Sequence, residues 1–206
     1  WTRQFDSTVT CITFGRDERR LAAGTRDGNV YLLQSSTGET TSHWKAPAPT
    51  SAADLANSGT LLVSSHSDAT VRVWRTQNES PVTIIAETGV NLERVRFSPE
   101  GKRIALCGQN SVRVFHWSRS SSQRTAIAEE VSRFWTSPDG SAVVHDGRKG
   151  ETNESVPSGI RVRKLPEKIA KSGNAHILGF GPSSEVFYTA EASVPDGQAP
   201  HSALNF

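Results

Sequence analysis

ANSGTLLVSSHSDATVRVWR, residues 56–75, combines two short apolar runs with two turn signals. Gly59 precedes the first run, and Asp68 separates it from Val71-Arg72-Val73-Trp74, whose β-branched and aromatic residues are typical of a strand. His66, Ser67 and Asp68 are also the residue types of a hydrolase triad. Successive side chains of an extended segment point in different directions, so we do not expect these three to converge on one catalytic site.

The same order of residue types recurs along the chain, with a polar turn between two short apolar runs in each copy. Related copies occupy residues 12–33, 95–115 and 131–144, and a weaker one begins at residue 176. The spacing is 41, 42 and 39 residues between the successive turn residues Glu18, Gly59, Gly101 and Gly140. Short strands repeating at this period predict an all-β chain, a β-propeller of four-stranded antiparallel blades.

We expect one domain over residues 1–206, with about four complete blades and part of a fifth. The predicted blades span about 9–46, 51–87, 92–129, 131–173 and, in part, 176–206. Since the chain begins at Trp1 and contains no methionine, we expect a segment of a longer protein, whose other blades or another chain would complete the ring. The alternative is a small ring in which His201–Phe206 is the third strand of blade five and Trp1–Phe5 its outer strand.

Several stretches carry a resemblance to a known family. They are LLVSSHSDATVRVW at 61–74, FSPEG at 97–101, RIAL at 103–106 and SVRVF at 111–115. Over roughly residues 9–190 the chain resembles the WD-repeat β-propellers. This resemblance implies a rigid platform for protein partners without catalytic activity of its own.

Blades of that family are often tied internally by a His, a Ser or Thr, an Asp and a Trp. Blade two matches three of these positions, whereas the place of the histidine falls at Ala46, so the resemblance implies an incomplete tether. Blade one keeps the Asp but has Leu33 at the Trp position, where blade three has Phe115. The structural blade residues are therefore Asp27, Ser64, Asp68 and Trp74.

Candidate partner-binding residues come from the turns and the inner strands, because loops held by a rigid sheet often carry binding residues. Arg and Trp are also frequent anchors of protein interfaces. The candidates are Arg26, Ser67, Arg94, Arg133 and Trp135. A second group, Arg72, Arg113 and Arg161, recurs in the third strand, and we expect these stems to pack between blades with their charged heads in water.

The composition bears on the function classes. Lys and Arg total 23 against 21 Asp and Glu, so the net charge of +2 does not favour a nucleic-acid partner. Cys11 and Cys107 lack metal-ligand spacing, and Asp54 and Glu93 are too few for a channel metal site. We expect no metal and no cofactor, no membrane span, and an intracellular location, cytoplasmic or nuclear.

The leading hypothesis is a non-enzymatic scaffold whose loops bind a protein partner of unknown identity. A regulatory or sensor propeller of a signalling ATPase or kinase is an alternative by analogy of fold. Two others are a propeller enzyme with a site in the central channel and an RNA- or DNA-associated propeller, for which the 17 arginines are the argument.

Overall fold

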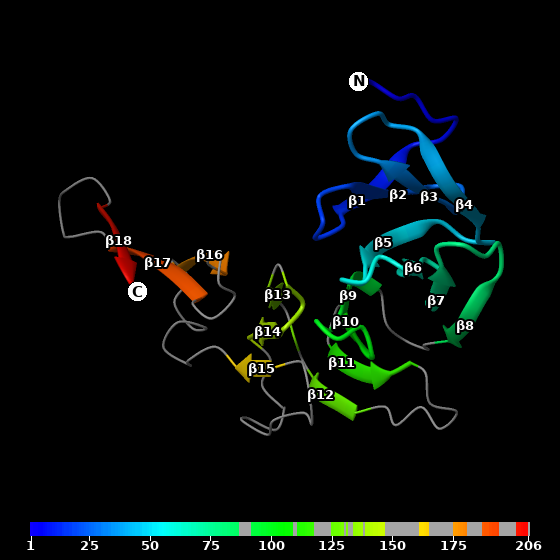
Figure 1. Cartoon of the computed structure of the whole chain (residues 1–206). Coiled ribbons are helices and arrows are strands. Elements are labelled where there is room, and N and C mark those ends of the chain that lie inside the picture. The colour runs from blue at the N-terminus through cyan, green and yellow to red at the C-terminus, as the bar shows by residue number, and fades with distance from the viewer. Residues whose placement is uncertain are drawn as a thin grey trace.

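The strands are arranged as five separate sheets in a computed structural model of the chain (Figure 1). It describes residues 1–86, 92–108, 111–117, 125–129, 131, 134–137, 139–146, 161–164, 175–180, 187–193 and 201–205. Every regular element in these ranges is a β-strand. The all-β prediction is therefore confirmed.

The first three sheets share one form, four antiparallel strands in chain order, and we call them blades one, two and three. Blade one contains β1 (Val9–Phe14), β2 (Arg20–Thr25), β3 (Asn29–Gln34) and β4 (Thr40–Lys45). Blade two contains β5 (Thr50–Leu55), β6 (Leu61–His66), β7 (Thr70–Arg75) and β8 (Pro81–Ala86). Blade three contains β9 (Leu92–Phe97), β10 (Arg103–Gly108), β11 (Ser111–His116) and β12 (Thr125–Glu129).

The first strands of successive blades lie side by side, β1 beside β5 and β5 beside β9, whereas β4 and β8 lie at the outer edge (Figure 1). This radial arrangement is that of a propeller. The turns between first and second strands share one end of the blades with the loops between third and fourth strands. The turns between second and third strands lie at the opposite end, because the strands alternate in direction.

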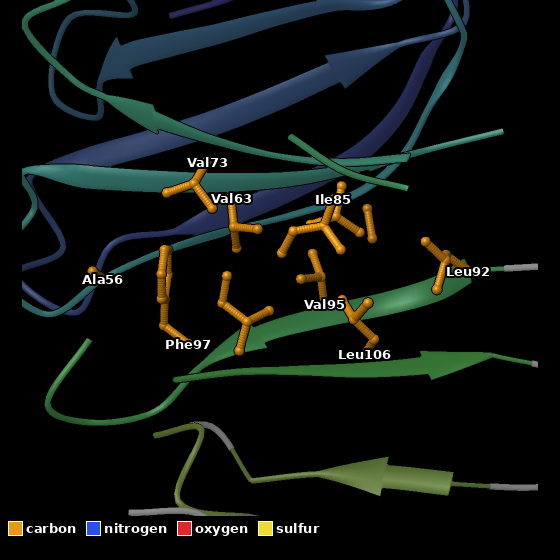
Figure 2. Packing of buried hydrophobic residues seen from close by; sticks show 11 residues of the cluster. Ala56, Val63, Val73, Ile85, Leu92, Val95, Phe97 and Leu106 are labelled. Atoms are coloured by element: carbon orange, nitrogen blue, oxygen red, sulfur yellow. The ribbon is translucent and has the colours of Figure 1, made fainter. Parts of the chain in front are cut away.

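The core lies between blades. Blades one and two share a cluster that includes Val30, Leu32, Trp44, Leu55 and Trp74. Figure 2 shows the next cluster, where side chains of blade two, including Val63 and Val73, face those of blade three, including Val95 and Phe97. Because each inner blade is covered on both faces, its strands show little of the alternation expected of a half-exposed sheet.

The fourth sheet differs from the predicted four-stranded antiparallel blade. It contains β13 (Phe134–Thr136), β14 (Ala142–His145) and β15 (Arg161–Lys164), and β15 pairs with β14 in parallel. Two parallel neighbours need a long connection, and residues 146–160 separate the end of β14 from the start of β15. Residues 165–173, the last part of the predicted fourth blade, lie outside the described ranges.

The fifth sheet contains β16 (Ala175–Phe180), β17 (Phe187–Ser193) and β18 (His201–Asn205), in that order. β18 is thus a third strand, as the small-ring alternative requires, but Trp1–Phe5 is not its neighbour. Residues 1–5 contact blade one instead, where the rings of Phe5 and Tyr31 have centroids 4.9 Å apart. Figure 1 shows the first and fifth sheets at opposite ends of an open arc. The closed five-blade ring is therefore wrong for this structure.

Candidate functional site

Two equivalent turns present predicted site residues at one end of blades one and two. Arg26 and Ser67 are 41 residues apart, both side chains are exposed, and both follow the last residue of a second strand. The backbone N–H of Arg26 donates to Thr8 O and that of Ser67 to Pro49 O, each at 2.9 Å. The structure therefore brings these two candidates to one face, which we call the turn face.

Residues with positive φ shape both turns. Gly28 has φ +88° and Ala69 has φ +59°, and the N–H of each donates to the carbonyl three residues earlier. This left-handed conformation is ordinary for glycine and uncommon for alanine. The tip of each turn is thus held by main-chain hydrogen bonds, which leaves the side chains of Arg26 and Ser67 exposed.

Asp27 organises the turn of blade one. Its carboxylate accepts hydrogen bonds from Thr25 Oγ1 at 2.7 Å, Asn29 Nδ2 at 2.6 Å and Lys45 Nζ at 3.0 Å. The Thr25 hydrogen bond first, and then Lys45, lower the pKa of Asp27 to about 2. Asp27 therefore carries a negative charge at neutral pH, and its three partners tie the turn to strands β2, β3 and β4.

Asp68 has the corresponding place in blade two. Burial opposes its ionisation, yet hydrogen bonds from the Thr70 hydroxyl at 2.6 Å and the Thr70 N–H at 3.1 Å leave the pKa of Asp68 lowered. Arg72 Nη2 lies 3.7 Å from this carboxylate, and Arg72 also donates to Thr70 Oγ1. Arg72 is buried, so the expectation that its head reaches water is wrong, because Asp68 and Thr70 replace that water.

A buried hydrogen-bond chain runs through blade two. Trp74 Nε1 donates to Ser64 Oγ at 2.8 Å, and Ser64 Oγ lies 2.8 Å from His66 Nε2. His66 Nδ1 lies 3.2 Å from Ala48 O, which can only accept. Nδ1 therefore carries a proton. Burial lowers the pKa of His66 to about 4, so the ring is neutral at pH 7 and Ser64 donates to Nε2.

This hydrogen-bond chain changes the interpretation of the blade tether and of the consecutive residues His66, Ser67 and Asp68. The histidine of this tether is His66, within the second strand, and not a residue at the expected position, which is Ala46. Asp68 takes no part in the tether. His66 is bonded to Ser64, whereas Ser67 is exposed on the turn and Asp68 binds Thr70. The three consecutive residues thus face different partners. Sequence reasoning missed the pair of Ser64 and His66, although two residues spaced by two in a strand share one face.

The inner strands carry the remaining candidates. The Arg94 guanidinium carbon lies 5.9 Å from the centre of the Phe134 ring, so this exposed residue of β9 contacts the fourth sheet. Trp135 is half-buried on β13, and Arg133 lies outside the described residues. Arg94 and Trp135 therefore lie on inner strands rather than in the turns that carry Arg26 and Ser67.

An ion pair between blades two and three was not predicted. Asp54 of β5 accepts from Arg96 Nη1 at 2.7 Å and from the Phe97 N–H at 2.8 Å, both on β9. Burial raises the pKa of Asp54, and the charge of Arg96 opposes this effect. The signal was present in the sequence, since Asp54 and Arg96 are oppositely charged residues 42 positions apart, one repeat period. This pair fixes the inner strands to each other.

The described part of the chain lacks both metal-site clusters and membrane-spanning helices. It contains no group of three or more His, Cys, Asp or Glu residues that could hold a metal ion. The same residues include no helix long and apolar enough to cross a bilayer.

The chain is similar to known proteins in sequence over its first blade and in fold over nearly its whole length. Residues 1–56 match a family model described as the anaphase-promoting complex subunit 4 WD40 domain. A crystal structure of the β-propeller domain of Cps50 (Swd1) from Myceliophteria thermophila is similar, with a TM-score of 0.64 at 15% identity. That match covers 98% of this chain and 72% of the other. No curated protein matches the chain. At this identity the structural likeness shows the β-propeller fold.

Proposed function

We propose that the chain is a WD40-repeat β-propeller and serves as a non-enzymatic platform whose turn face binds a protein partner. WD40 propeller domains generally mediate protein–protein interaction and are generally scaffolds rather than enzymes. The observation that carries the proposal is the equivalent anchoring of Arg26 and Ser67, each held by a 2.9 Å main-chain bond and each exposed.

Rigid anchoring matters for affinity. A loop that is ordered before binding loses less conformational entropy when the partner arrives. The Arg26 guanidinium offers five donors in a planar fork, which suits a carboxylate on the partner. We therefore propose a partner segment with an acidic residue opposite Arg26 and a polar contact at Ser67.

An intracellular location, cytoplasmic or nuclear, is part of the same proposal. Its support is that Cys11 and Cys107 are both free thiols. Burial raises the pKa of the Cys107 thiol to about 12, which keeps it protonated and unreactive at neutral pH.

Quantitative affinity capture from the source cells tests the turn face. Arg26→Glu and Ser67→Glu are each expected to reduce the captured partner at least tenfold, because each adds a negative charge opposite an acidic segment. Ser36→Glu is the matched control, since Ser36 is an exposed serine in the loop between β3 and β4, at the opposite end of blade one. A partner lost with Ser36→Glu and retained with both turn-face variants would contradict the proposal.

A further inference from the structure

Strand β8 is the last strand of blade two, and one of its two edges is open. It pairs with β7 on one side, and no other described strand lies along its second side (Figure 1). The edge of a sheet presents a row of unpaired N–H and C=O groups, which can pair with a strand of another chain. Proteins commonly prevent such pairing with charged side chains on the edge strand.

Blade one has this protection on its own last strand. Alternate residues of β4, Thr41, His43 and Lys45, are exposed and polar. Lys45 Nζ lies 3.0 Å from the carboxylate of Asp27, and His43 Nε2 lies 3.0 Å from Asn29 Oδ1. The exposed face of β4 therefore carries a positive charge and polar groups that have partners within the blade.

Blade two has apolar residues at all three places. Val82, Ile84 and Ala86 each follow their counterpart in β4 by 41 residues, one repeat period. Val82 is 41% exposed and Ile84 is 56% exposed. The open edge of β8 thus has two exposed β-branched side chains beside it and lacks the lysine of blade one.

The sheet registers show that the missing charge is particular to blade two. Lys45, Ala86 and Glu129 each pair with the first residue of the third strand of their blade. This place is therefore charged in blades one and three and uncharged in blade two. Packing within the fold does not account for the apolar character of Ile84, because more than half of that side chain is exposed.

We propose that the open edge of β8 binds an extended segment of a protein partner, which pairs antiparallel with β8 and becomes a fifth strand of blade two. In this mode of recognition main-chain hydrogen bonds give affinity and alternate side chains give specificity. The side chains that the segment places beside Val82 and Ile84 are β-branched or aromatic, since such cross-strand pairs stabilise a sheet. This edge is separate from the turn face and does not depend on it.

Charge gives the segment its direction. Glu79 is exposed two residues before β8, and within the described residues its carboxylate forms no ion pair. In an antiparallel pair the C-terminal end of the added strand lies beside the N-terminal end of β8. A lysine or arginine at the C-terminal end of the segment therefore lies near Glu79, where opposite charges favour this orientation.

The size of the edge favours an extended segment over a second copy of the chain. β8 has six residues and spans about 20 Å. A stable interface between two folded proteins covers roughly 800 Å² on each partner. β8 exposes only two large apolar side chains, whereas an extended segment can use the whole edge through its main chain.

Fluorescence anisotropy with the purified 206-residue chain tests the edge. The probe is a labelled peptide, Gly-Thr-Val-Thr-Ile-Thr-Lys, acetylated and amidated at its ends, and we expect saturable binding. Ile84→Lys is expected to weaken this binding at least tenfold, because it restores a charge to the edge. Ile84→Thr keeps a β-branched residue without a charge and is the control at the same position. His43→Lys is the control at the equivalent position of blade one, and both controls are expected to leave the affinity within about threefold.

Two N-methylated forms of the peptide separate strand pairing from adhesion of apolar side chains. One form is methylated at the odd-numbered amides and the other at the even-numbered amides. Since only alternate residues of an antiparallel strand direct their N–H to a given neighbour, one form is expected to lose at least tenfold in affinity and the other to retain binding. Equal affinities of the two forms, whether high or low, would overturn the proposal.

A charge exchange tests the direction of the segment. Replacing the lysine of the peptide by glutamate is expected to weaken binding about threefold at low salt, and Glu79→Lys is expected to restore it. Absence of saturable binding up to about 1 mM peptide would overturn the proposal. Self-association of the chain that Ile84→Lys abolishes would also overturn it, since the occupant would be a second copy. Arg26→Glu is expected to leave peptide binding unchanged, which distinguishes failure of this edge from failure of the turn face.

Discussion

The indole Nε1 of Trp74 donates to the hydroxyl of Ser64 at 2.8 Å, the first bond of a hydrogen-bond chain that continues through His66 to Ala48 O. A carbonyl can only accept, so His66 Nδ1 carries a proton, and because the pKa of His66 is lowered to about 4, Nε2 is unprotonated at neutral pH and accepts from Ser64. Ser64, His66 and Trp74 are all buried. A fully satisfied buried network of this kind holds neighbouring strands in one arrangement.

Ser64→Ala removes the centre of this network. It leaves the Trp74 N–H without an acceptor and His66 Nε2 without a donor, both in a buried environment. We expect a loss of about 2–3 kcal/mol in the free energy of unfolding, measured by urea denaturation. Ser67→Ala, at an exposed serine three residues away, is the control and is expected to change stability by less than about 0.5 kcal/mol. Equal effects of the two variants would show that the network adds no stability.

The protonation of His66 predicts a pH dependence. Burial first, and the charge of Arg72 second, lower the pKa of His66 from 6.5 to about 4. The unfolded chain therefore binds more protons than the folded chain between pH 6.5 and 4. The contribution is complete above pH 6.5 and is lost as the pH falls toward 4, by roughly 3 kcal/mol at most.

Urea denaturation between about pH 7.5 and 4 measures this loss. His66→Gln is expected to flatten the slope in that window, because the group that titrates is gone. His43→Gln is the control, since His43 is exposed and its ring stacks on Tyr31 at the outer strand of blade one. A slope that survives in His66→Gln would assign the pH dependence to other groups.

The repeat was predictable because the same left-handed backbone conformation recurs once in each period. Four turn residues, Glu18, Gly59, Gly101 and Gly140, define the spacing, and all four have φ between +54° and +70°. The spacing therefore located a left-handed position without any knowledge of coordinates.

Other features depend on how side chains meet in the folded structure, and these were not predicted. Arg72 is ordinary in the strand pattern, and only the positions of Thr70 and Asp68 make its burial possible. The parallel pair β14 and β15 departs from the antiparallel pairing of the other repeats, and residues 146–160 separate the two strands. Of the site candidates, Arg26 and Ser67 lie together because the repeat places them so, whereas Arg94 and Trp135 were identified by residue type and belong to inner strands.

The Asp54–Arg96 pair predicts a larger effect than an exposed ion pair. Asp54→Ala leaves the Arg96 guanidinium and the Phe97 N–H without their acceptor at the junction of blades two and three, so we expect a loss of about 3 kcal/mol. Asp17→Ala breaks an ion pair with Arg20 in which both side chains are about 30% exposed, and is expected to cost about 1 kcal/mol or less. Thermal unfolding of both variants compares them, and a smaller loss for Asp54→Ala would contradict the interpretation.

Glu18 is the one member of the four repeated turn positions that is not glycine. The turn closes in the same way in blades one and two, where Gly15 N donates to Arg20 O and Ala56 N to Leu61 O. Glu18 has φ +54°, a conformation that costs a residue with a Cβ about 1 kcal/mol. Glu18→Gly is therefore expected to raise the free energy of unfolding by about 0.5–1 kcal/mol.

Two glycine variants separate the backbone cost from steric clash. A Cβ at Gly101 would meet only Ala56 Cβ at 3.7 Å, so Gly101→Ala reports the cost of its φ of +70° and is expected to lose about 1 kcal/mol. A Cβ at Gly140 would lie 1.9 Å from Phe97 O, a backbone atom that cannot move aside, so Gly140→Ala is expected to lose about 2 kcal/mol or more. If Glu18→Gly lowered stability while Gly101→Ala also lowered it, the left-handed requirement would not be shared by the four turns. Chemical denaturation of the three variants decides between these outcomes. The free energy of unfolding gained by Glu18→Gly should be similar in size to that lost by Gly101→Ala.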